Sequence, residues 1–433
     1  MTERSLLLVS ADDHAGPPLP VYRDYFDPAE RDEFDRYWRA RPHAKAAEAA
    51  AAGDLDALAS SLVAFMRATG ASEDAAKSFA TRAHRLTAGL FISSVRDACL
   101  DEEGIAAEVL YPDGFVENHP PYRDPADAER LWSGSERRSF ELQLAGSRAY
   151  NRWLAAFCGE SSERRAGAIL LPPAYDVAAV VTEMTRARRS GLRGGVLIPP
   201  LAPGLPGHHD AWYDPIWSAA IDLGLPIAIH GGTATAPDAK DVFGGLEPLA
   251  SILHFTECAF FDRRPLWHFM WGGVFDRHPQ LRLIFAEALA HWVPQELLRL
   301  DEMYDMWNLK LLRDQLPLRP SEYWRRNCAI TATFPSRAEI EMRAAIGLEN
   351  LLWGSDYPHP EGTWPHTETC LRHAFHGIAS DATDAILGSN AIELYGFDRK
   401  LLRTIADRIG PDPARIALPP ETLPTDYVGM GLR

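Results

Sequence analysis

Residues 165–200 read RAGAILLPPAYDVAAVVTEMTRARRSGLRGGVLIPP. This stretch holds an apolar run at 165–171, a helical pattern at 178–189 and a second apolar run at 194–198, and a Pro-Pro pair follows each run. A strand, a helix and a second strand in this order form a βαβ unit, in which the two strands lie parallel. The stretch therefore predicts a parallel sheet covered by helices.

The same alternation continues on both sides of this unit. Further strands are predicted at 5–11, 106–111, 226–230, 281–286, 328–333 and 351–355, and further helices at 217–223, 337–346, 364–376 and 381–394. Eight strands with intervening helices favour an α/β fold of the (β/α)8 TIM barrel type. The rival is an open Rossmann sheet, but no predicted strand is followed by G-x-G-x-x-G and the chain has no Gly-Lys-Ser/Thr phosphate loop.

Two segments do not fit a barrel connection. Residues 20–100 are rich in Ala, Asp, Glu and Arg, and predict a helical insertion after the first strand. This insertion is either a lid over the barrel mouth or a packing appendage or oligomer contact. We expect one metal-dependent barrel domain over residues 1–398, including the insertion, and a C-terminal extension over 399–433 that packs on the barrel or on a partner subunit.

Composition excludes several classes of protein. The chain has 433 residues, is 46% hydrophobic and carries a formal charge of -16, which excludes a disordered chain and argues against nucleic acid or an anionic membrane as partner. We find no signal peptide and no apolar run long enough for a transmembrane helix. Five widely separated cysteines fit reduced thiols. We therefore expect a cytoplasmic enzyme, a homodimer, that acts on a small molecule.

Residues able to bind a metal stand at the ends of four predicted strands. The first strand leads into S-A-D-D-H, in which Asp12 and His14 share one face because side chains alternate along a strand. The fifth strand ends at His230, and the sixth ends at Glu287. Taken singly, such residues are also explained by a surface pair, a buried histidine or an ion pair with an arginine.

The eighth strand ends in W-G-S-D-Y-P-H, which supplies Asp356 and His359. In a parallel barrel the carboxyl ends of all strands meet at one mouth, so these side chains are expected to converge with those of the other three strands. Mixed imidazole and carboxylate ligands suit zinc, iron, manganese or cobalt, and the absence of Cys ligands disfavours a structural zinc site.

Five stretches resemble the amidohydrolase superfamily: S-A-D-D-H, L-P-I-A-I-H-G-G, L-I-F-A-E-A-L-A-H-W-V-P, L-L-W-G-S-D-Y-P-H-P-E-G-T-W-P and S-N-A-I-E-L-Y-G-F-D. The resemblance is closer to the decarboxylase-like branch, which includes aminocarboxymuconate-semialdehyde and dihydroxybenzoate decarboxylases. It implies a distorted (β/α)8 barrel and a divalent metal held by Asp12, His14, His230 and Asp356. It also implies that Asp356 handles the proton of a metal-bound water.

The chain departs from the family at two positions. The predicted fourth strand ends without lysine, and no lysine lies between Lys77 and Lys240, which excludes a dinuclear site bridged by a carboxylated lysine. The sixth strand ends in Glu287 where the family's decarboxylases usually have histidine. Glu287 is therefore expected as a further ligand or a base. His291 replaces the missing imidazole if a helix begins there, and is otherwise a surface residue.

These residues lead to four hypotheses about function. The first is hydrolysis of a small organic substrate by a metal-activated water, with Asp356 as the base and Glu287, His291 and His359 as further catalytic candidates. The others are non-oxidative decarboxylation of an aromatic or unsaturated acid, oxygenation at a non-haem iron or diiron site, and a barrel that has lost its chemistry. We expect one or two divalent transition-metal ions, zinc first, with iron or manganese as alternatives.

Overall fold

The computed structural model describes residues 5–41, 43–56, 59–60, 63–64, 67, 73–113, 118–123, 136–231, 249–306, 313–424, 427, 429 and 432. Within these residues eight strands follow one another: β1 (Leu8–Ala15), β2 (Ile105–Pro112), β3 (Arg165–Gly167), β4 (Val196–Leu197), β5 (Ile227–His230), β6 (Leu283–Ala286), β7 (Cys328–Thr333) and β8 (Leu351–Gly354). All paired neighbours run parallel, in the orders β1-β2-β3 and β4-β5-β6-β7-β8.

Backbone contacts join the two sheets into a closed barrel. On one side Ile169, just after β3, forms a parallel bridge with Val196 of β4. On the other side the amide of Asp356 donates to the carbonyl of Asp12, and the amide of His14 donates to that of Tyr357, both at 2.8 Å. The predicted (β/α)8 barrel is confirmed, and its distortion comes from the short β3 and β4 and from irregular pairing of β1 with β2.

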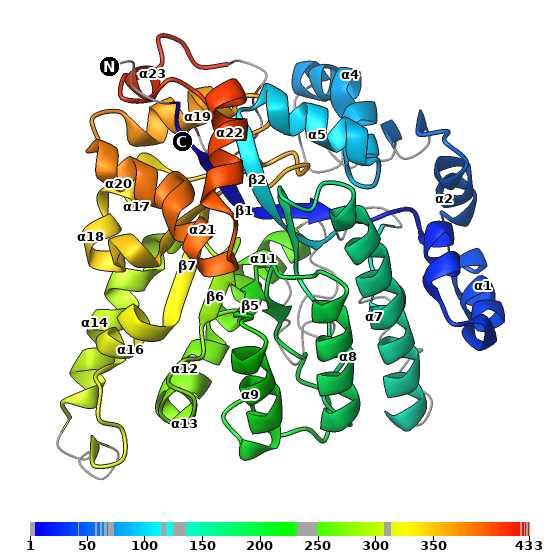
Figure 1. The fold of residues 1–433 in the computed structure, drawn as a ribbon, viewed down its shortest axis with the longest axis horizontal. Coiled ribbons are helices and arrows are strands. Elements are labelled where there is room, and N and C mark those ends of the chain that lie inside the picture. The colour runs from blue at the N-terminus through cyan, green and yellow to red at the C-terminus, as the bar shows by residue number, and fades with distance from the viewer. Residues whose placement is uncertain are drawn as a thin grey trace.

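Helices surround this barrel on the outside (Figure 1). Those between β2 and β8 are α7 (Glu136–Gly159), α8 (Val177–Arg189), η4 (Ala211–Tyr213), α9 (Asp214–Asp222), α11 (Leu249–Phe261), α12 (Arg264–Trp271), α13 (Val274–Arg277), η5 (Ala290–Trp292), α14 (Val293–Tyr304), α16 (Pro320–Asn327), α17 (Arg337–Glu341), α18 (Arg343–Ile346) and η7 (Leu348–Asn350). None of the described helices is long and apolar enough to cross a membrane.

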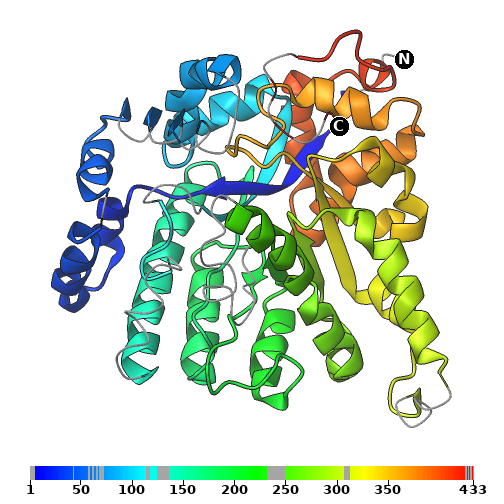
Figure 2. The ribbon, with the colours of Figure 1, turned by 180° about the vertical axis from the view of Figure 1, so that it is seen from behind.

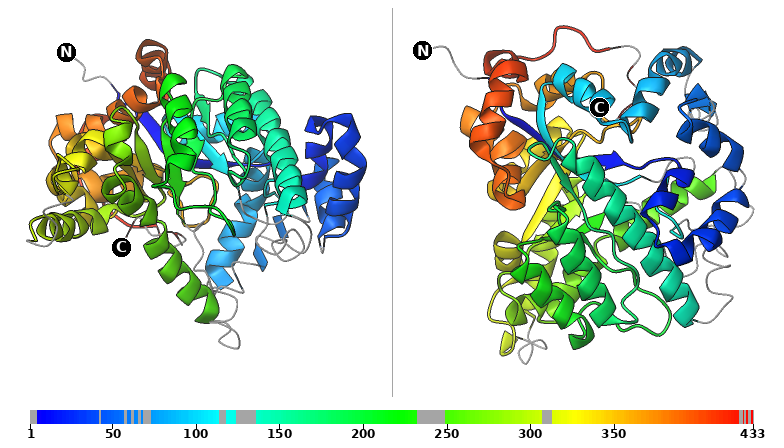
Figure 3. Two further views of the ribbon diagram at one scale, coloured as in Figure 1. Left: turned by 90° about the horizontal axis from the view of Figure 1, so that it is seen from below. Right: turned by 45° about the vertical axis from the view of Figure 1, so that its right-hand side comes forward.

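The segment between β1 and β2 is helical, as the sequence predicts. It contains η1 (Leu19–Tyr25), η2 (Pro28–Glu30), α1 (Arg31–Arg39), α2 (Ala44–Ala51), α4 (Glu73–Gly89) and α5 (Ser93–Glu102). Helices α1 and α2 stand at the edge of the molecule, whereas α4 and α5 lie close to β1 and β2 (Figures 2 and 3). The Tyr357 hydroxyl, beyond β8, donates to the carbonyl of Arg85 in α4 at 3.3 Å. The insertion therefore contacts the end of the barrel that follows β8, and its role as a lid stays a prediction.

The chain after β8 forms α19 (Thr367–Phe375), α20 (Ser380–Asp384), the π-helical turn η8 (Ala385–Ser389), α21 (Asn390–Tyr395), α22 (Arg399–Ile409) and α23 (Pro413–Ile416). Small inward-facing side chains such as Ala107, Ala166 and Ala228 fill the barrel together with Tyr395 and Leu402 of the C-terminal helices. An apolar cluster therefore occupies the barrel interior, and α21 and α22 contribute to it beside β1 and β2.

A buried charge network fastens the insertion to the first three strands. Arg96 of α5 donates to Glu108 of β2 from Nε and Nη2, at 2.9 and 2.6 Å, and from Nη1 to the carbonyl of His14 at 2.6 Å. Arg165 of β3 places Nε 3.3 Å from the other oxygen of Glu108. All three charged side chains are fully buried. Glu108 therefore contacts two buried guanidinium groups, and Arg165 has a second carboxylate, Asp97, at 2.8 Å from its Nη2.

Replacement of Glu108 by Gln tests this network. The substitution leaves the buried Arg96 without its carboxylate and Arg165 with Asp97 alone, so we expect the free energy of unfolding to fall by about 3–5 kcal/mol. Glu368→Gln is the matched control, because Glu368 pairs with Arg415 at 2.6 Å on an exposed surface, where a pair contributes about 0–1 kcal/mol. Urea denaturation measures both variants, and an equal loss in the two would contradict the assignment.

Candidate metal centre

Six side chains from four strand ends meet at the carboxyl-terminal mouth of the barrel. Nε2 of His14 lies 3.2 Å from Oδ1 of Asp356, and Nε2 of His230 lies 3.3 Å from Oδ1 of Asp12 and 3.5 Å from Oε2 of Glu287. Donor atoms bound to one transition metal at about 2.0–2.2 Å stand about 3.0–3.5 Å from each other. The observed spacing therefore allows these side chains to be ligands of a common ion.

In the part of the chain that the structure describes, these side chains form two overlapping groups with potential ligand atoms within 4.8 Å of one another. Asp12, His14 and His230 form the first group, and His14 joins Glu287, Asp356 and His359 in the second. The five residues predicted as metal ligands are thus brought together, and His359 with them. Their assignment as ligands is a proposal, developed under Proposed function.

The alternation of side chains along β1 directs two of these residues into the barrel mouth. Asp12 and His14 face inward, whereas Asp13 between them accepts hydrogen bonds from the Ser355 hydroxyl at 2.5 Å and the Tyr357 amide at 2.8 Å. Side chains that alternate along a strand give this arrangement, as the sequence predicts. The strand itself continues to Ala15, further than expected, so both ligand candidates lie within β1 and inherit its rigidity.

Hydrogen bonds outside the cluster hold the candidate ligands in orientation. Nδ1 of His14 lies 2.9 Å from the carbonyl of Pro112, and Nδ1 of His230 lies 3.0 Å from that of Gly231. Each Nδ1 therefore carries the proton, and Nε2 is left as the metal-binding atom. The Thr333 hydroxyl donates to Oδ2 of Asp12 at 2.5 Å, which turns Oδ1 toward His230.

The loops after β6 and β8 adopt strained backbone conformations. Glu287 has φ of 49° and Asp356 has φ of 61°, in the left-handed region that non-glycine residues rarely occupy. Gly231 is required beside them, because a Cβ at this position would lie 2.2 Å from the carbonyl oxygen of Glu287. This strain presents both carboxylates to the barrel mouth.

The charges of the cluster are poorly balanced without a cation. Burial and the negative charge of Asp356 raise the pKa of Glu287 well above its ordinary value. Burial opposes the charged form of His230, but Asp12 and Glu287 outweigh it and raise its pKa to about 9. Burial likewise opposes ionisation of Asp356, yet His359 and His14 lower its pKa to about 2. Burial and the neighbouring histidines lower the pKa of His14, although Asp356 acts in the opposite direction.

Apart from contacts with one another, several buried atoms of the cluster have no hydrogen-bond partner among the described residues. They are Oδ1 of Asp12, Nε2 of His14 and both carboxylate oxygens of Asp356. A buried polar atom without a partner costs about 1–3 kcal/mol, so natural proteins leave few of them. A divalent ion would coordinate these atoms and compensate the acidic charge, and the residues therefore fit a metal of the kind the sequence predicts.

The structure does not bring His291 to this site. Its side chain is 55% exposed, and Nδ1 lies 3.8 Å from Glu339 instead. The expectation that His291 faces Glu287 required an α-helix at this point. The chain instead passes through Leu289 at φ of 45° into the short 3-10 turn η5, and His291 takes the surface position that was expected as the alternative.

Two neighbours of the cluster are not among the predicted site residues. Asp113, just after β2, places Oδ1 3.5 Å from Nε2 of His359, whose Nδ1 lies 2.9 Å from Asp356. Asp113 follows the end of a strand, the same signal that identified the other acids. Thr333 ends β7, and its role depends on the hydroxyl meeting Asp12, which no local pattern shows.

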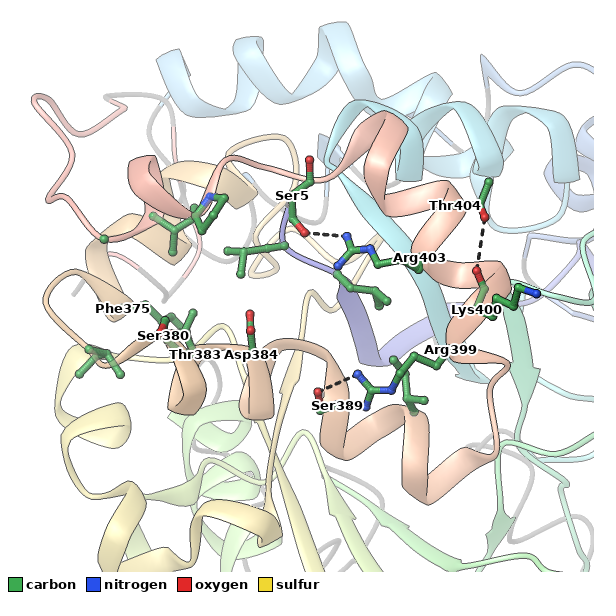
Figure 4. Close-up of a pocket in the computed structure, with 17 residues that line it drawn as sticks. Ser5, Phe375, Ser380, Thr383, Asp384, Ser389, Arg399, Lys400, Arg403 and Thr404 are labelled. Carbon is green, nitrogen blue, oxygen red and sulfur yellow. Dashed lines mark hydrogen bonds between the residues drawn. The ribbon is translucent and has the colours of Figure 1, made fainter. Parts of the chain in front are cut away.

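A hollow of about 920 Å³ lies at the opposite end of the barrel, where Leu6 and Leu7 enter β1 (Figure 4). Arg403 donates there to the carbonyl of Ser5, and Arg399 donates to the hydroxyl of Ser389. Neither group of potential metal ligands includes a residue that lines this hollow. The potential metal-binding groups of the described residues therefore lie at the mouth and not at this hollow.

A closed parallel barrel with acids and imidazoles at its carboxyl-terminal mouth defines the class of (β/α)8 barrel enzymes with a candidate metal centre. A family profile described as amidohydrolase matches residues 114–397. The chain belongs to this family and is an enzyme of the amidohydrolase superfamily.

The chain resembles several individual proteins. Decarboxylase orsB of Emericella nidulans is 28% identical over 227 residues, which cover 49% of this chain and 64% of that protein, so the match spans less than two thirds of that relative. The crystal structure of 5-carboxyvanillate decarboxylase LigW from Sphingomonas paucimobilis matches with a TM-score of 0.61 and 21% identity over 91% of this chain and 100% of that one.

A manganese-bound dihydroxybenzoic acid decarboxylase from Polaromonas sp. JS666 matches with a TM-score of 0.57 and 19% identity. This match covers 78% of the present chain and 94% of the Polaromonas chain. At these identities the two solved structures establish a shared barrel fold.

Metal content tests the cluster directly. We expect His230→Ala to lose most of its bound metal after dialysis, because it removes an imidazole that faces both Asp12 and Glu287. His291→Ala serves as the control and is expected to keep the wild-type content. Thr333→Val is expected to weaken metal binding about 10–100-fold, through the lost hydrogen bond to Asp12. Elemental analysis measures all three, and unchanged metal in His230→Ala would contradict the site.

Proposed function

We propose that this enzyme is a metal-dependent decarboxylase that releases carbon dioxide, without oxidation, from an aromatic or unsaturated carboxylic acid. The observation that carries the proposal is the series Asp356, His359 and Asp113 beside the metal-binding group. Both ring nitrogens of His359 lie near carboxylates, at 2.9 Å from Asp356 and 3.5 Å from Asp113. Two flanking carboxylates stabilise an imidazolium. The site therefore holds a proton ready to be given.

Hydrolysis and decarboxylation make opposite demands on such a group. Hydrolysis needs a base that takes a proton from water, whereas decarboxylation needs an acid that gives a proton to carbon. A histidine with acids on both sides suits the second demand. The names of orsB, LigW and the Polaromonas enzyme, all decarboxylases, add support to this choice over the hydrolysis that the sequence first favoured.

Asp12, His14 and His230 would hold the metal in this proposal, with Glu287 and Asp356 as the remaining ligand candidates. When bound, a divalent ion would attract the carboxylate of the acid and a neighbouring oxygen, and so stabilise negative charge on the substrate. Zinc remains our first expectation for this mixed set of nitrogen and oxygen donors. Manganese gains support from the Polaromonas relative, and iron stays an alternative.

The protein's own residues would then transfer one proton. His359 passes its proton through Asp356 to the substrate carbon that bears the carboxylate, using a pair of π electrons of the substrate. The bond from this carbon to the carboxylate breaks, and its electrons restore the π system as neutral carbon dioxide leaves. His359 regains a proton from solvent. Burial of Asp356 and His14 keeps bulk water away from the transfer.

Product analysis separates the candidate reactions. The metal-loaded enzyme is incubated with a panel of hydroxylated benzoic acids, and we expect release of carbon dioxide without oxygen consumption. Hydrolysis would instead incorporate oxygen from ¹⁸O-labelled water, and a diiron oxygenase would consume dioxygen and contain two irons per chain. Either of these outcomes, or no carbon dioxide from any acid, would contradict the proposal.

His359→Gln tests the proton donor. We expect kcat to fall about 10²–10⁴-fold with metal content unchanged, because a neutral amide cannot supply the proton. His278→Gln is the matched control, since His278 is a buried histidine 3.1 Å from Asp214, placed ahead of β6 at the other end of the barrel. Its kcat is expected to stay within about threefold of wild type. Equal activity of the two variants would remove His359 from the reaction.

Removal of the metal is expected to lower thermal stability as well as activity. A ligand present at 100 times its dissociation constant stabilises the folded state by about 2.7 kcal/mol. Chelation should therefore lower the melting temperature, and added zinc or manganese should restore both properties. If neither the chelator nor added metal changed the melting temperature, this would show that the cluster binds no ion.

A further inference from the structure

The hollow at the amino-terminal end of the barrel is formed by three separate parts of the chain (Figure 4). Its lining comes from residues 5–7 ahead of β1, from the segment that holds α19, α20, η8 and α21, and from α22 and α23. Its volume of about 920 Å³ lies in the range of pockets that hold small organic molecules, roughly 300–1,000 Å³. The hollow is therefore large enough for an organic ligand.

Basic side chains gather on one wall of this hollow. Helix α22 supplies Arg399, Lys400 and Arg403, and α20 on the other side supplies Asp384, the single acidic residue of the lining (Figure 4). The whole chain has the opposite balance, with 60 acidic residues against 44 basic ones. The hollow is therefore a positive region in an acidic protein, and such a region attracts anions.

Two of the three cations form no ion pair with any described residue. Arg399 donates to a neutral serine hydroxyl at 3.1 Å, and Lys400 has no carboxylate partner in the part of the chain that the structure describes. Arg403 places Nε 3.0 Å from Asp407 and donates from Nη2 to the carbonyl of Ser5 at 2.6 Å. The acid across the hollow pairs with none of the three, so the positive charge of this wall is available to a ligand.

Apolar side chains form most of the remaining lining. They come from the start of the chain and from the helices after β8, and are Leu6, Leu7, Phe375, Ile378, Ile392 and Ile416. Covering apolar surface with an apolar group contributes roughly 25 cal/mol for each Å² removed from water. A basic wall beside an apolar one fits a molecule with one anionic end and one apolar end.

We propose that this hollow is a second ligand site, separate from the metal centre, for a small amphipathic anion: an apolar body that carries one carboxylate or phosphate group. The anionic group lies among Arg399, Lys400 and Arg403, because guanidinium groups match carboxylate and phosphate oxygens through pairs of hydrogen bonds. The apolar body covers Leu7 and Ile378. Leu7 immediately precedes β1, so the ligand contacts the start of the strand that carries two candidate metal ligands.

Calorimetry on the metal-loaded enzyme tests the site with three probes of equal chain length: octanoate, octyl phosphate and octan-1-ol. We expect at least one of the two anions to bind about 10–100-fold more tightly than the alcohol, because hydrogen bonds to a charged group are the stronger ones. The anion that binds more tightly identifies the head group. An alcohol that binds as tightly as both anions, or no binding of any probe, would overturn the proposal.

The double variant Arg399→Gln with Lys400→Gln tests the basic wall. It should bring the affinity for the anion to within about threefold of that for the alcohol, since both unpaired cations are lost. Arg408→Gln is the matched control, because Arg408 lies on the same helix but pairs with Asp101 at 2.7 Å outside the lining. The control should keep the wild-type preference. Loss of the preference in both proteins, or in neither, would contradict the assignment.

A variant that fills the hollow shows where the anion binds. Ala417 is an exposed residue of the lining, and Ala417→Trp should weaken binding of the anion by about tenfold or more, because the indole takes the space of the apolar body. Ala414→Trp is the control, since Ala414 is exposed on α23 but outside the lining. Both positions are on the surface, so neither change disturbs the core. Unchanged affinity in Ala417→Trp would place the anion elsewhere, at the metal centre included, and would overturn the proposal.

Discussion

The hydrogen bond from the Asp356 amide to the Asp12 carbonyl closes the barrel and also assembles the site. It joins the first strand to the chain just beyond the last one, so that two candidate metal ligands separated by almost the whole barrel sequence become neighbours. The second contact, from His14 to Tyr357, fixes the register of this seam. Any slip of one residue would turn Asp12 and His14 away from the mouth and expose Asp13 there.

Buried charged side chains support this junction between the first strand and the chain beyond the last one. Arg96 holds the carbonyl of His14 and the carboxylate of Glu108 at once, and its guanidinium lies over the ring of Tyr357 at 4.5 Å. The inserted helix α5 is therefore bound to both sides of the closure. The insertion, expected as a lid or a packing appendage, therefore also helps to position the candidate metal ligands.

The sequence shows which side chains meet, because barrel strands carry their functional groups at their carboxyl ends. Asp12, His14, His230, Glu287, Asp356 and His359 all follow from this rule. His291 does not, since its position depends on the backbone turn at Leu289, and a spacing of four residues has meaning only within an α-helix. Thr333 and the pairing of Asp113 with His359 depend on contacts between distant strands, which one sequence cannot reveal.

Element boundaries show the same limit. The predicted first strand ends at residue 11, yet β1 runs from Leu8 to Ala15 because its polar end is covered by β2 and by the chain after β8. The predicted helix at 381–394 is split by a π-helical turn, where Gly388 passes so close to the carbonyl of Leu7 that a Cβ would lie 2.1 Å away. Tertiary contacts, which local patterns do not contain, set both boundaries.

The packed interior of the barrel limits the routes by which small molecules can reach and leave the candidate site. Buried alanine side chains pack between the strands, and Tyr395 and Leu402 join them at the end where β1 begins. A substrate and its products would therefore share one entrance, the carboxyl-terminal mouth, beside which Tyr357 contacts α4. A molecule bound there would block the departure of a product as well as the arrival of the next substrate.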